Sequence, residues 1–241
     1  MHSISIIIPA YNEALRLPST LNRVLEWTGS QAFTFCEVIV VDDGSRDETT
    51  SVVERFSTGQ ASIRLLRNPG NRGKGYAVRH GMLEAKGEWL LFTDADLSTP
   101  IEEVTTLYRR VQEEGAVIAI GSRALDPSLV EVHQAAFREW SGKLFNLVMR
   151  RVTGLNFRDT QCGFKLFQFR AAHQVFSRQK LDGFSFDVEA LFIARRLSLK
   201  TVEVPVRWRN VEGTKVGAIN GSQSFADLFR IRWSGAKGKY D

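Results

Sequence analysis

Two aspartates, separated by one residue, follow a short apolar run near the middle of the chain. Asp94 and Asp96 come directly after residues 89–92, and in an extended segment their side chains leave the backbone on the same side. Hard carboxylate oxygens suit Mg²⁺ or Mn²⁺, ions that bridge a protein carboxylate to diphosphate oxygens. Such an ion would neutralise charge on a departing diphosphate group. An Asp-x-Asp sequence alone more often forms a turn or a helix cap than a metal site. The other polar segments of the chain must therefore distinguish these two interpretations.

Two further polar segments each follow an apolar run and could contact a ligand. The first contains Pro9, Tyr11 and Glu13, and the second contains Asp42 and Asp43. A carboxylate directly after a strand can accept hydrogen bonds from the imide of uracil or from the N1 and N2 hydrogens of guanine, a role open to Asp42 or Asp43. Alternatively, these aspartates form a turn that caps the next helix.

A third polar segment, residues 71–75, places two glycines around Lys74 at the start of a predicted helix. Free backbone N–H groups, the helix dipole and the Lys74 ammonium group would all favour an anion there. A glycine turn beside a solvated lysine gives the same pattern. A phosphate site and a simple turn both remain open on these residues alone.

Alternating strands and helices place these segments at one edge of a sheet. Helical patterns begin near Pro18, Asp47, Lys74 and Pro100, between short apolar runs that predict buried strands. This alternation predicts an α/β fold with a mainly parallel sheet covered on both faces, in which ligands bind beyond the carboxyl ends of the strands. We therefore expect the polar segments to converge on one rim. The predicted strands are residues 4–8, 38–41, 63–66, 89–92 and 117–120.

The pattern changes after Ser122, although no linker or repeat marks a domain boundary. We expect one domain of residues 1–241, ending in a short helix and a frayed Gly- and Lys-rich tail. The second half contains a predicted long helix at 135–152, an apolar run at 164–169, a predicted helix at 187–197 and a predicted strand at 202–206.

Composition and charge narrow the classes of function. Hydrophobic residues make up 43% of the 241 residues and charged residues 24%, a globular balance. The net charge of +5 suggests an anionic partner, which could be nucleic acid, a phospholipid surface or a phosphorylated small molecule. Because Lys and Arg are spread along the chain, a nucleic-acid footprint has little support. Cys36 and Cys162 cannot build a disulfide framework, and no secretion signal is evident, so we expect a reducing cytoplasm.

The order of the motifs resembles family 2 of the glycosyltransferases, which have the GT-A fold. The segments that match this family over the first half are Pro-Ala-Tyr-Asn-Glu (9–13), Asp-Asp-Gly-Ser (42–45), Asn-x-Gly-Lys-Gly (71–75), Asp-Ala-Asp (94–96) and Gly-Ser-Arg (121–123). In the second half, residues 159–165, 184–189 and 212–215 resemble the polyprenyl-phosphate branch, and within it the dolichyl-phosphate β-glucosyltransferases. The resemblance implies a metal-dependent hexosyltransferase. Its Rossmann-like half, 1–122, would bind a nucleotide sugar, and its other half, 123–241, would bind the acceptor.

The resemblance also implies roles for individual residues. Asp94 and Asp96 would bind Mg²⁺ or Mn²⁺, with Asp96 the more direct ligand, and Arg123 would face an acceptor phosphate together with Arg138 and Lys215. The expected catalytic residues are therefore Asp94, Asp96, Arg123 and Arg138. In the donor site, Pro9, Tyr11, Glu13 and Asp42 would surround the base and ribose. The other expected residues of the nucleotide-sugar site are Asp43, Lys74 and Asp94.

A phosphate acceptor suits this set of residues. A phosphate monoester is already ionised at neutral pH, so it needs positioning by arginine forks rather than a general base. We expect a single inverting displacement from UDP-glucose to a polyprenyl phosphate. GDP-mannose is an alternative donor, and a saccharide acceptor would require Asp159 or another carboxylate as base. A nucleic-acid-binding module would leave the Asp-Ala-Asp motif unused. Asp187 and Glu189 are left outside the predicted site.

Two amphipathic segments bear on localisation. Residues 135–152 and 225–233 combine apolar and aromatic side chains with cations, a pattern typical of interfacial helices and equally of core helices. Eukaryotic enzymes of the resembled type carry an N-terminal membrane anchor, and many mannosyl relatives carry C-terminal spans. This sequence has neither, so we expect peripheral contact with the cytoplasmic face of a membrane, or none.

Overall fold

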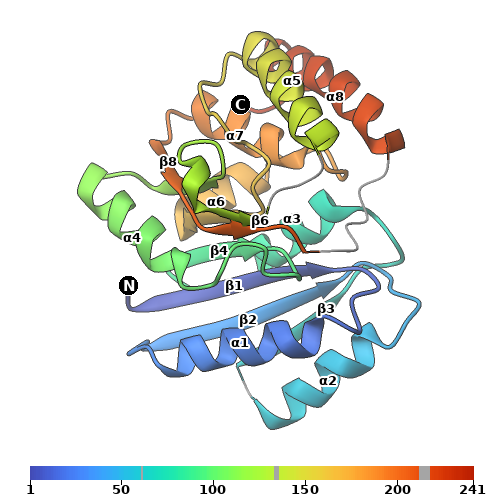
Figure 1. Cartoon of the computed structure of the whole chain (residues 1–241), viewed down its shortest axis with the longest axis vertical. Coiled ribbons are helices and arrows are strands. Elements are labelled where there is room, and N and C mark those ends of the chain that lie inside the picture. Colours follow the sequence, from blue (N-terminus) through green and yellow to red (C-terminus); the bar gives the residue numbers. More distant parts are fainter. Residues whose placement is uncertain (61, 133–135, 212–217) are drawn as a thin grey trace.

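One seven-stranded sheet runs through the structure, a computed structural model that describes residues 1–60, 62–132, 136–211 and 218–241 (Figure 1). Within those ranges, the side chains of 136–141, 143–144 and 218–222 are not described. The strand order is β3-β2-β1-β4-β7-β5-β8. The strands are β1 (Ser3–Ala10), β2 (Phe35–Asp42), β3 (Ile63–Arg67), β4 (Trp89–Thr93), β5 (Ile118–Ser122), β7 (Phe164–Gln168) and β8 (Thr201–Pro205).

Helices cover both faces of this sheet, as the alternating pattern predicts. Along β1, Ile6 and Ile8 belong to the core under α1, α2 and α4, whereas Ile7 belongs to the core under α3 and α5–α8, because successive strand side chains point to opposite faces. Figure 1 shows α5 beside α8 at one end of the molecule and α1 with α2 at the other. The helices are α1 (Leu17–Gly29), α2 (Thr49–Gly59), α3 (Lys74–Glu84), α4 (Glu103–Glu114), α5 (Ala136–Thr153), α6 (Phe169–Phe176), α7 (Phe186–Arg196) and α8 (Ala218–Ala236).

Strand β7 is the exception to the parallel sheet, and it has a consequence for the site. It lies antiparallel between β4 and β5, with Thr93 opposite Phe164. The turn that precedes β7 therefore meets the carboxyl end of β4, where the Asp94 N–H donates to the Gly163 carbonyl at 3.2 Å. Asp94 and Gly163, which are distant along the chain, are brought together in this way.

A small parallel pair, β6 (Val130–Val132) and β9 (Trp208–Arg209), lies beside the main sheet after the short 3₁₀ turn η1 (Pro127–Leu129). The Arg209 N–H donates to the Ser98 carbonyl at 2.9 Å, so β9 is attached to the segment that follows Asp96. The sequence analysis did not anticipate this pair, because strands of two or three residues carry almost no periodic signal.

Three details of the second half differ from the sequence analysis. The apolar run at 164–169 forms strand β7 up to Gln168, and a helix that was not predicted, α6, begins at Phe169 and buries Ala171, Ala172 and Val175. The terminal helix α8 has 19 residues and is not short. The tail after it is not frayed, because Tyr240 is only 1% exposed and its hydroxyl donates to Glu189.

Candidate active site

A cavity of about 590 Å³ lies beyond the carboxyl ends of β1, β2 and β4. All four polar segments contribute to its wall, which confirms the expected convergence on one rim. Predicted site residues in this wall are Pro9, Tyr11, Glu13, Asp43, Lys74, Asp94 and Asp96; Ala10, Arg16, Asn71, Gly73, Ala77, Ala95 and Phe184 complete the lining. Arg16 and Phe184 were not among the predicted site residues, although Phe184 begins the 184–189 segment that carries part of the resemblance.

The two aspartates after β2 have different contacts. The Asp43 carboxylate accepts from the backbone N–H groups of Arg72 at 3.0 Å and Gly73 at 2.7 Å, and from the Asn68 amide at 2.7 Å. It thereby positions the glycine–lysine segment, residues 71–75. Asp42 does not line the cavity, and its Oδ1 accepts from the Ser45 N–H at 3.2 Å, as in a turn. Contact between Asp42 and a nucleotide base stays a prediction.

Asp94 is held from two sides. Its Oδ1 lies 2.7 Å from the Lys74 ammonium nitrogen. Burial alone would lower the pKa of Lys74, but the charges of Asp94 and Asp187 raise it above its ordinary value, so the ammonium form is retained. On the other side, a Cβ atom at position 163 would come within 1.9 Å of the Asp94 Oδ2. Gly163 is therefore required for the Asp94 carboxylate to occupy this position.

Asp96 has a different environment from Asp94. Its Oδ1 accepts from the Ser98 N–H at 2.9 Å. Burial and then the neighbouring Asp94 charge raise the pKa of Asp96, which means that a nearby cation would be favoured. Among the described residues, no group of three or more His, Cys, Asp or Glu could hold a metal ion. The two carboxylates nevertheless fit Mg²⁺ or Mn²⁺, since such ions are commonly held by one or two carboxylates together with substrate phosphates.

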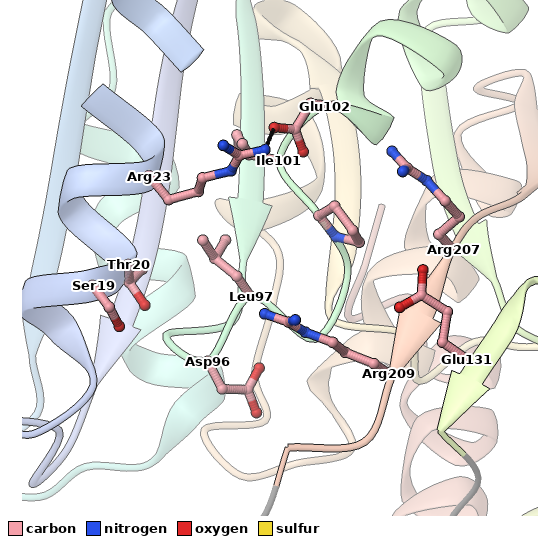
Figure 2. Close-up of a pocket in the computed structure, with 11 residues that line it drawn as sticks. Ser19, Thr20, Arg23, Asp96, Leu97, Ile101, Glu102, Glu131, Arg207 and Arg209 are labelled. Atoms are coloured by element: carbon pink, nitrogen blue, oxygen red, sulfur yellow. Dashed lines mark hydrogen bonds and ion pairs between the residues drawn. The ribbon is translucent and has the colours of Figure 1, made fainter. Parts of the chain in front are cut away.

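A second cavity, also about 590 Å³, lies on the other side of Asp96 (Figure 2). It is bounded by α1, the segment after β4, and the β6–β9 pair. Figure 2 shows the Arg209 side chain extending into it near Leu97 and Asp96. Within the described part of the chain Arg209 has no ion-pair partner, whereas Arg207 pairs with Glu103 and Arg23 with Glu102.

Arg123 follows β5 and forms a fork-shaped pair with Asp159. Its Nε and Nη2 donate to the two Asp159 oxygens at 2.6 and 2.9 Å, and its guanidinium group lies 5.4 Å from the centre of the Trp208 ring. Burial would raise the pKa of Asp159, but the Arg123 charge and hydrogen bonds lower it to about 2. For Arg123, burial would lower the pKa, and the Asp159 charge raises it instead. Nη1 has no hydrogen-bond partner among the described residues.

Two predicted acceptor contacts cannot be placed. Lys215 lies outside the described residues, and although the backbone of Arg138 belongs to α5, its side chain also lies outside them. Contact between either residue and an acceptor phosphate stays a prediction.

Comparison with known proteins identifies the family. The family described as Glycosyl transferase family 2 matches residues 5–176, well over half of the chain. The chain belongs to glycosyltransferase family 2. It is 39% identical over 241 residues to the dolichyl-phosphate β-glucosyltransferase of Drosophila melanogaster. The matched region covers 95% of this chain and 74% of the relative. The human enzyme of the same name is 35% identical over 225 residues, covering 88% of this chain and 69% of that one.

Solved structures confirm the fold of this glycosyltransferase. Glucosyl-3-phosphoglycerate synthase from Mycobacterium tuberculosis, in complex with Mn²⁺, UDP-glucose and phosphoglyceric acid, superposes with a TM-score of 0.68 at 18% identity, covering 96% of this chain and 80% of that one. Mannosyl-3-phosphoglycerate synthase from Rubrobacter xylanophilus gives 0.69 at 17% identity, covering 99% and 75%. At these identities the likeness establishes the GT-A fold.

Proposed function

We propose that this glycosyltransferase moves glucose from UDP-glucose to a polyprenyl phosphate of the dolichyl type, with inversion at the anomeric carbon. The relatives named as dolichyl-phosphate β-glucosyltransferases support the hexose and the acceptor. The neighbour crystallised with UDP-glucose and Mn²⁺ has the same fold, which supports a uridine nucleotide and a divalent cation.

The pairing of Asp159 with Arg123 is the observation that favours a phosphate acceptor over a sugar hydroxyl in this proposal. Transfer to a sugar hydroxyl needs a general base, and a base is effective when its pKa is near the working pH. Asp159 has a pKa of about 2, and both of its oxygens already accept from Arg123. It is therefore a poor base at neutral pH. A phosphate acceptor does not require one, because it is ionised before it binds.

The residues of the site then act by positioning and charge. Asp43 holds residues 71–75 so that Lys74 faces the donor diphosphate, and the Arg123 Nη1 is directed to the acceptor phosphate by the pair that Arg123 forms with Asp159. A cation held by Asp96 and Asp94 would supply charge neutralisation for the departing diphosphate. Holding two anionic groups in line is the main task left to the protein.

A screen of donors and acceptors tests the proposal. The protein is incubated with Mn²⁺ and either UDP-glucose or GDP-mannose, each with a short-chain prenyl phosphate or a simple saccharide, and the product is identified by mass spectrometry. We expect a glucosyl prenyl phosphate as the main product. A glucosylated saccharide would overturn the acceptor, and a mannosyl lipid would overturn the donor.

We further propose peripheral attachment to the cytoplasmic face of a membrane, which would bring the protein to its lipid acceptor. Leu147 on α5 is 54% exposed, and Phe229 and Trp233 on α8 are 62% and 56% exposed. The exposed Arg230 and Arg232 flank them. Apolar side chains edged by cations suit an anionic interface. None of the helices in the described ranges is long and apolar enough to cross a membrane.

A further inference from the structure

A fully buried carboxylate on α7 links the C-terminal tail to the segment that precedes α7. Glu189 is 0% exposed. Its Oε2 accepts from the Leu181 N–H at 2.8 Å, both of its oxygens lie 3.1 Å from the Lys180 nitrogen, and its Oε1 accepts from the Tyr240 hydroxyl at 2.7 Å. A single side chain thus ties residues 180–181 to the tail.

The segment tied in this way, residues 179–185, packs against the segment that carries Lys74. The Gln179 amide donates to the Gly75 carbonyl at 2.9 Å, and the Tyr76 N–H donates to the Asp182 carbonyl at 3.1 Å. A Cβ at Gly75 would lie 2.7 Å from the Leu181 oxygen, which shows how closely the two backbones approach. A shift of residues 179–185 would therefore move residues 71–75.

Both segments reach the donor cavity. Phe184 and Lys74 line it, and Lys74 pairs with Asp94 at 2.7 Å. The hydrogen bonds just described connect Tyr240 through Glu189 and residues 179–185 to this pair. Tyr240 itself is held in the core, where its ring lies 6.0 Å from that of Phe192, and Asp241 pairs with Arg196.

We propose that Glu189 and Tyr240 are positioning residues for the donor diphosphate. Glu189 accepts the two backbone N–H groups and the Tyr240 hydroxyl together, and so holds residues 179–185 where they support Lys74 and Phe184. Neither residue faces the cavity, and each acts through the segment between them. The inference rests on the proposed function, because it assumes that this cavity binds a nucleoside diphosphate.

The test compares Tyr240→Phe and Glu189→Gln with the unchanged protein. The first removes one hydroxyl and keeps the buried ring, whereas the second keeps the side-chain volume but replaces the two carboxylate acceptor oxygens by one neutral amide oxygen. Binding of UDP with Mn²⁺ is measured by calorimetry, and exchange of the Lys180, Leu181 and Tyr76 amide hydrogens is followed without ligand. Ile231→Val, a core change in α8 that removes none of the hydrogen bonds described above, serves as the control.

We expect about three- to tenfold weaker UDP binding in each variant, with faster exchange at the three amides in both. Ile231→Val should lower the melting temperature and leave UDP affinity unchanged. Faster exchange with unaltered UDP affinity in both variants would make the contact structural only and overturn the proposal. Failure of the unchanged protein to bind UDP would instead overturn the proposed donor.

Discussion

Asp94 and Asp96 are two residues apart, yet they have different partners. Asp94 has an ammonium partner in Lys74, whereas the hydrogen bond given to the Asp96 carboxylate comes from the Ser98 backbone. Burial and the Asp94 charge raise the pKa of Asp96, so a cation beside Asp96 would relieve unfavourable charge. That Asp96 is the more direct metal ligand stays a prediction, and this difference is the reason to test it first.

Removal of the metal, or of the Asp96 carboxylate, should therefore slow transfer severely without unfolding the protein. We expect Asp96→Ala to lower kcat by about 10²- to 10³-fold, the range for loss of one group that stabilises transition-state charge, and Asp94→Ala to have a milder effect. Turnover with Mn²⁺ and with excess chelator, alongside circular dichroism, measures this. Full turnover in chelator would show that no metal is needed.

Gly163 offers a test of the Asp94 position that leaves both carboxylates in place. In Gly163→Ala the new methyl group would overlap the Asp94 carboxylate, which can rotate away at small cost to stability but loses its contact with Lys74. We expect kcat/KM to fall about tenfold or more, with little change in melting temperature. Gly29→Ala is the matched control, because a Cβ atom there would meet nothing within 4 Å beyond its chain neighbours and its own helix. Normal activity in Gly163→Ala would mean that the Asp94 position is not critical.

The Arg123–Asp159 pair predicts how stability depends on acid. Asp159 has a folded pKa of about 2 against an ordinary value of 3.8, so its stabilisation is present above about pH 4 and is lost as pH falls toward 2. This difference in pKa corresponds to a contribution of ~2 kcal/mol to the free energy of unfolding at neutral pH. About half of it, ~1 kcal/mol, should be lost by about pH 3. Asp159→Asn removes this titration. The free energies of unfolding of the unchanged protein and of Asp159→Asn, measured with urea, should therefore converge from about pH 5 to pH 3. A constant difference between them would contradict the low pKa of Asp159.

At the scale of elements, the strands that carry the site could be predicted from the sequence. The contacts between residues that follow different strands could not. The apolar runs before Glu13, Asp43 and Asp94 have clear boundaries, and parallel topology alone brings their ends together. Nothing local indicates that β7 is antiparallel, so the contact between Gly163 and Asp94 was not foreseen. The pair of Arg123 and Asp159 was also missed, because their partnership depends on the fold and not on spacing.

The exposed α5 and α8 side chains predict binding to lipid. Replacing Phe229 and Trp233 together by Ser removes apolar surface that could enter an interface, where each buried side chain contributes up to about 1.5–3 kcal/mol. We expect at least about tenfold weaker partition onto vesicles containing anionic phospholipid, measured by sedimentation. Phe35→Ser, an exposed apolar site on β2, should bind as the unchanged protein does. Equal vesicle binding by the unchanged protein, the double variant and Phe35→Ser would contradict the proposed membrane face.

On the scale of the whole molecule, one sheet joins the two halves of the chain. Strands β7 and β8 come from residues after 122, yet β7 pairs directly with β4. The proposed donor would therefore touch residues from both halves, since Phe184 lines the same cavity as Pro9 and Asp43. A ligand held across the sheet in this way should stabilise the folded chain as a unit.

Thermal unfolding with nucleotide and metal measures this coupling. A ligand at one hundred times its Kd adds ~2.7 kcal/mol to the free energy of unfolding, which for a chain of this size is a rise of about 5–10 °C in Tm. Because Asp96 and diphosphate oxygens would share the cation, we expect UDP with Mn²⁺ to raise Tm by more than the sum of the separate shifts. In Asp96→Ala the shift from UDP alone should persist, since the other residues that line the cavity are unchanged, while the extra shift with Mn²⁺ should disappear. Strictly additive Tm shifts in the unchanged protein would mean that the metal and the diphosphate bind independently. The proposal that Asp94 and Asp96 share a cation with the diphosphate would then be wrong.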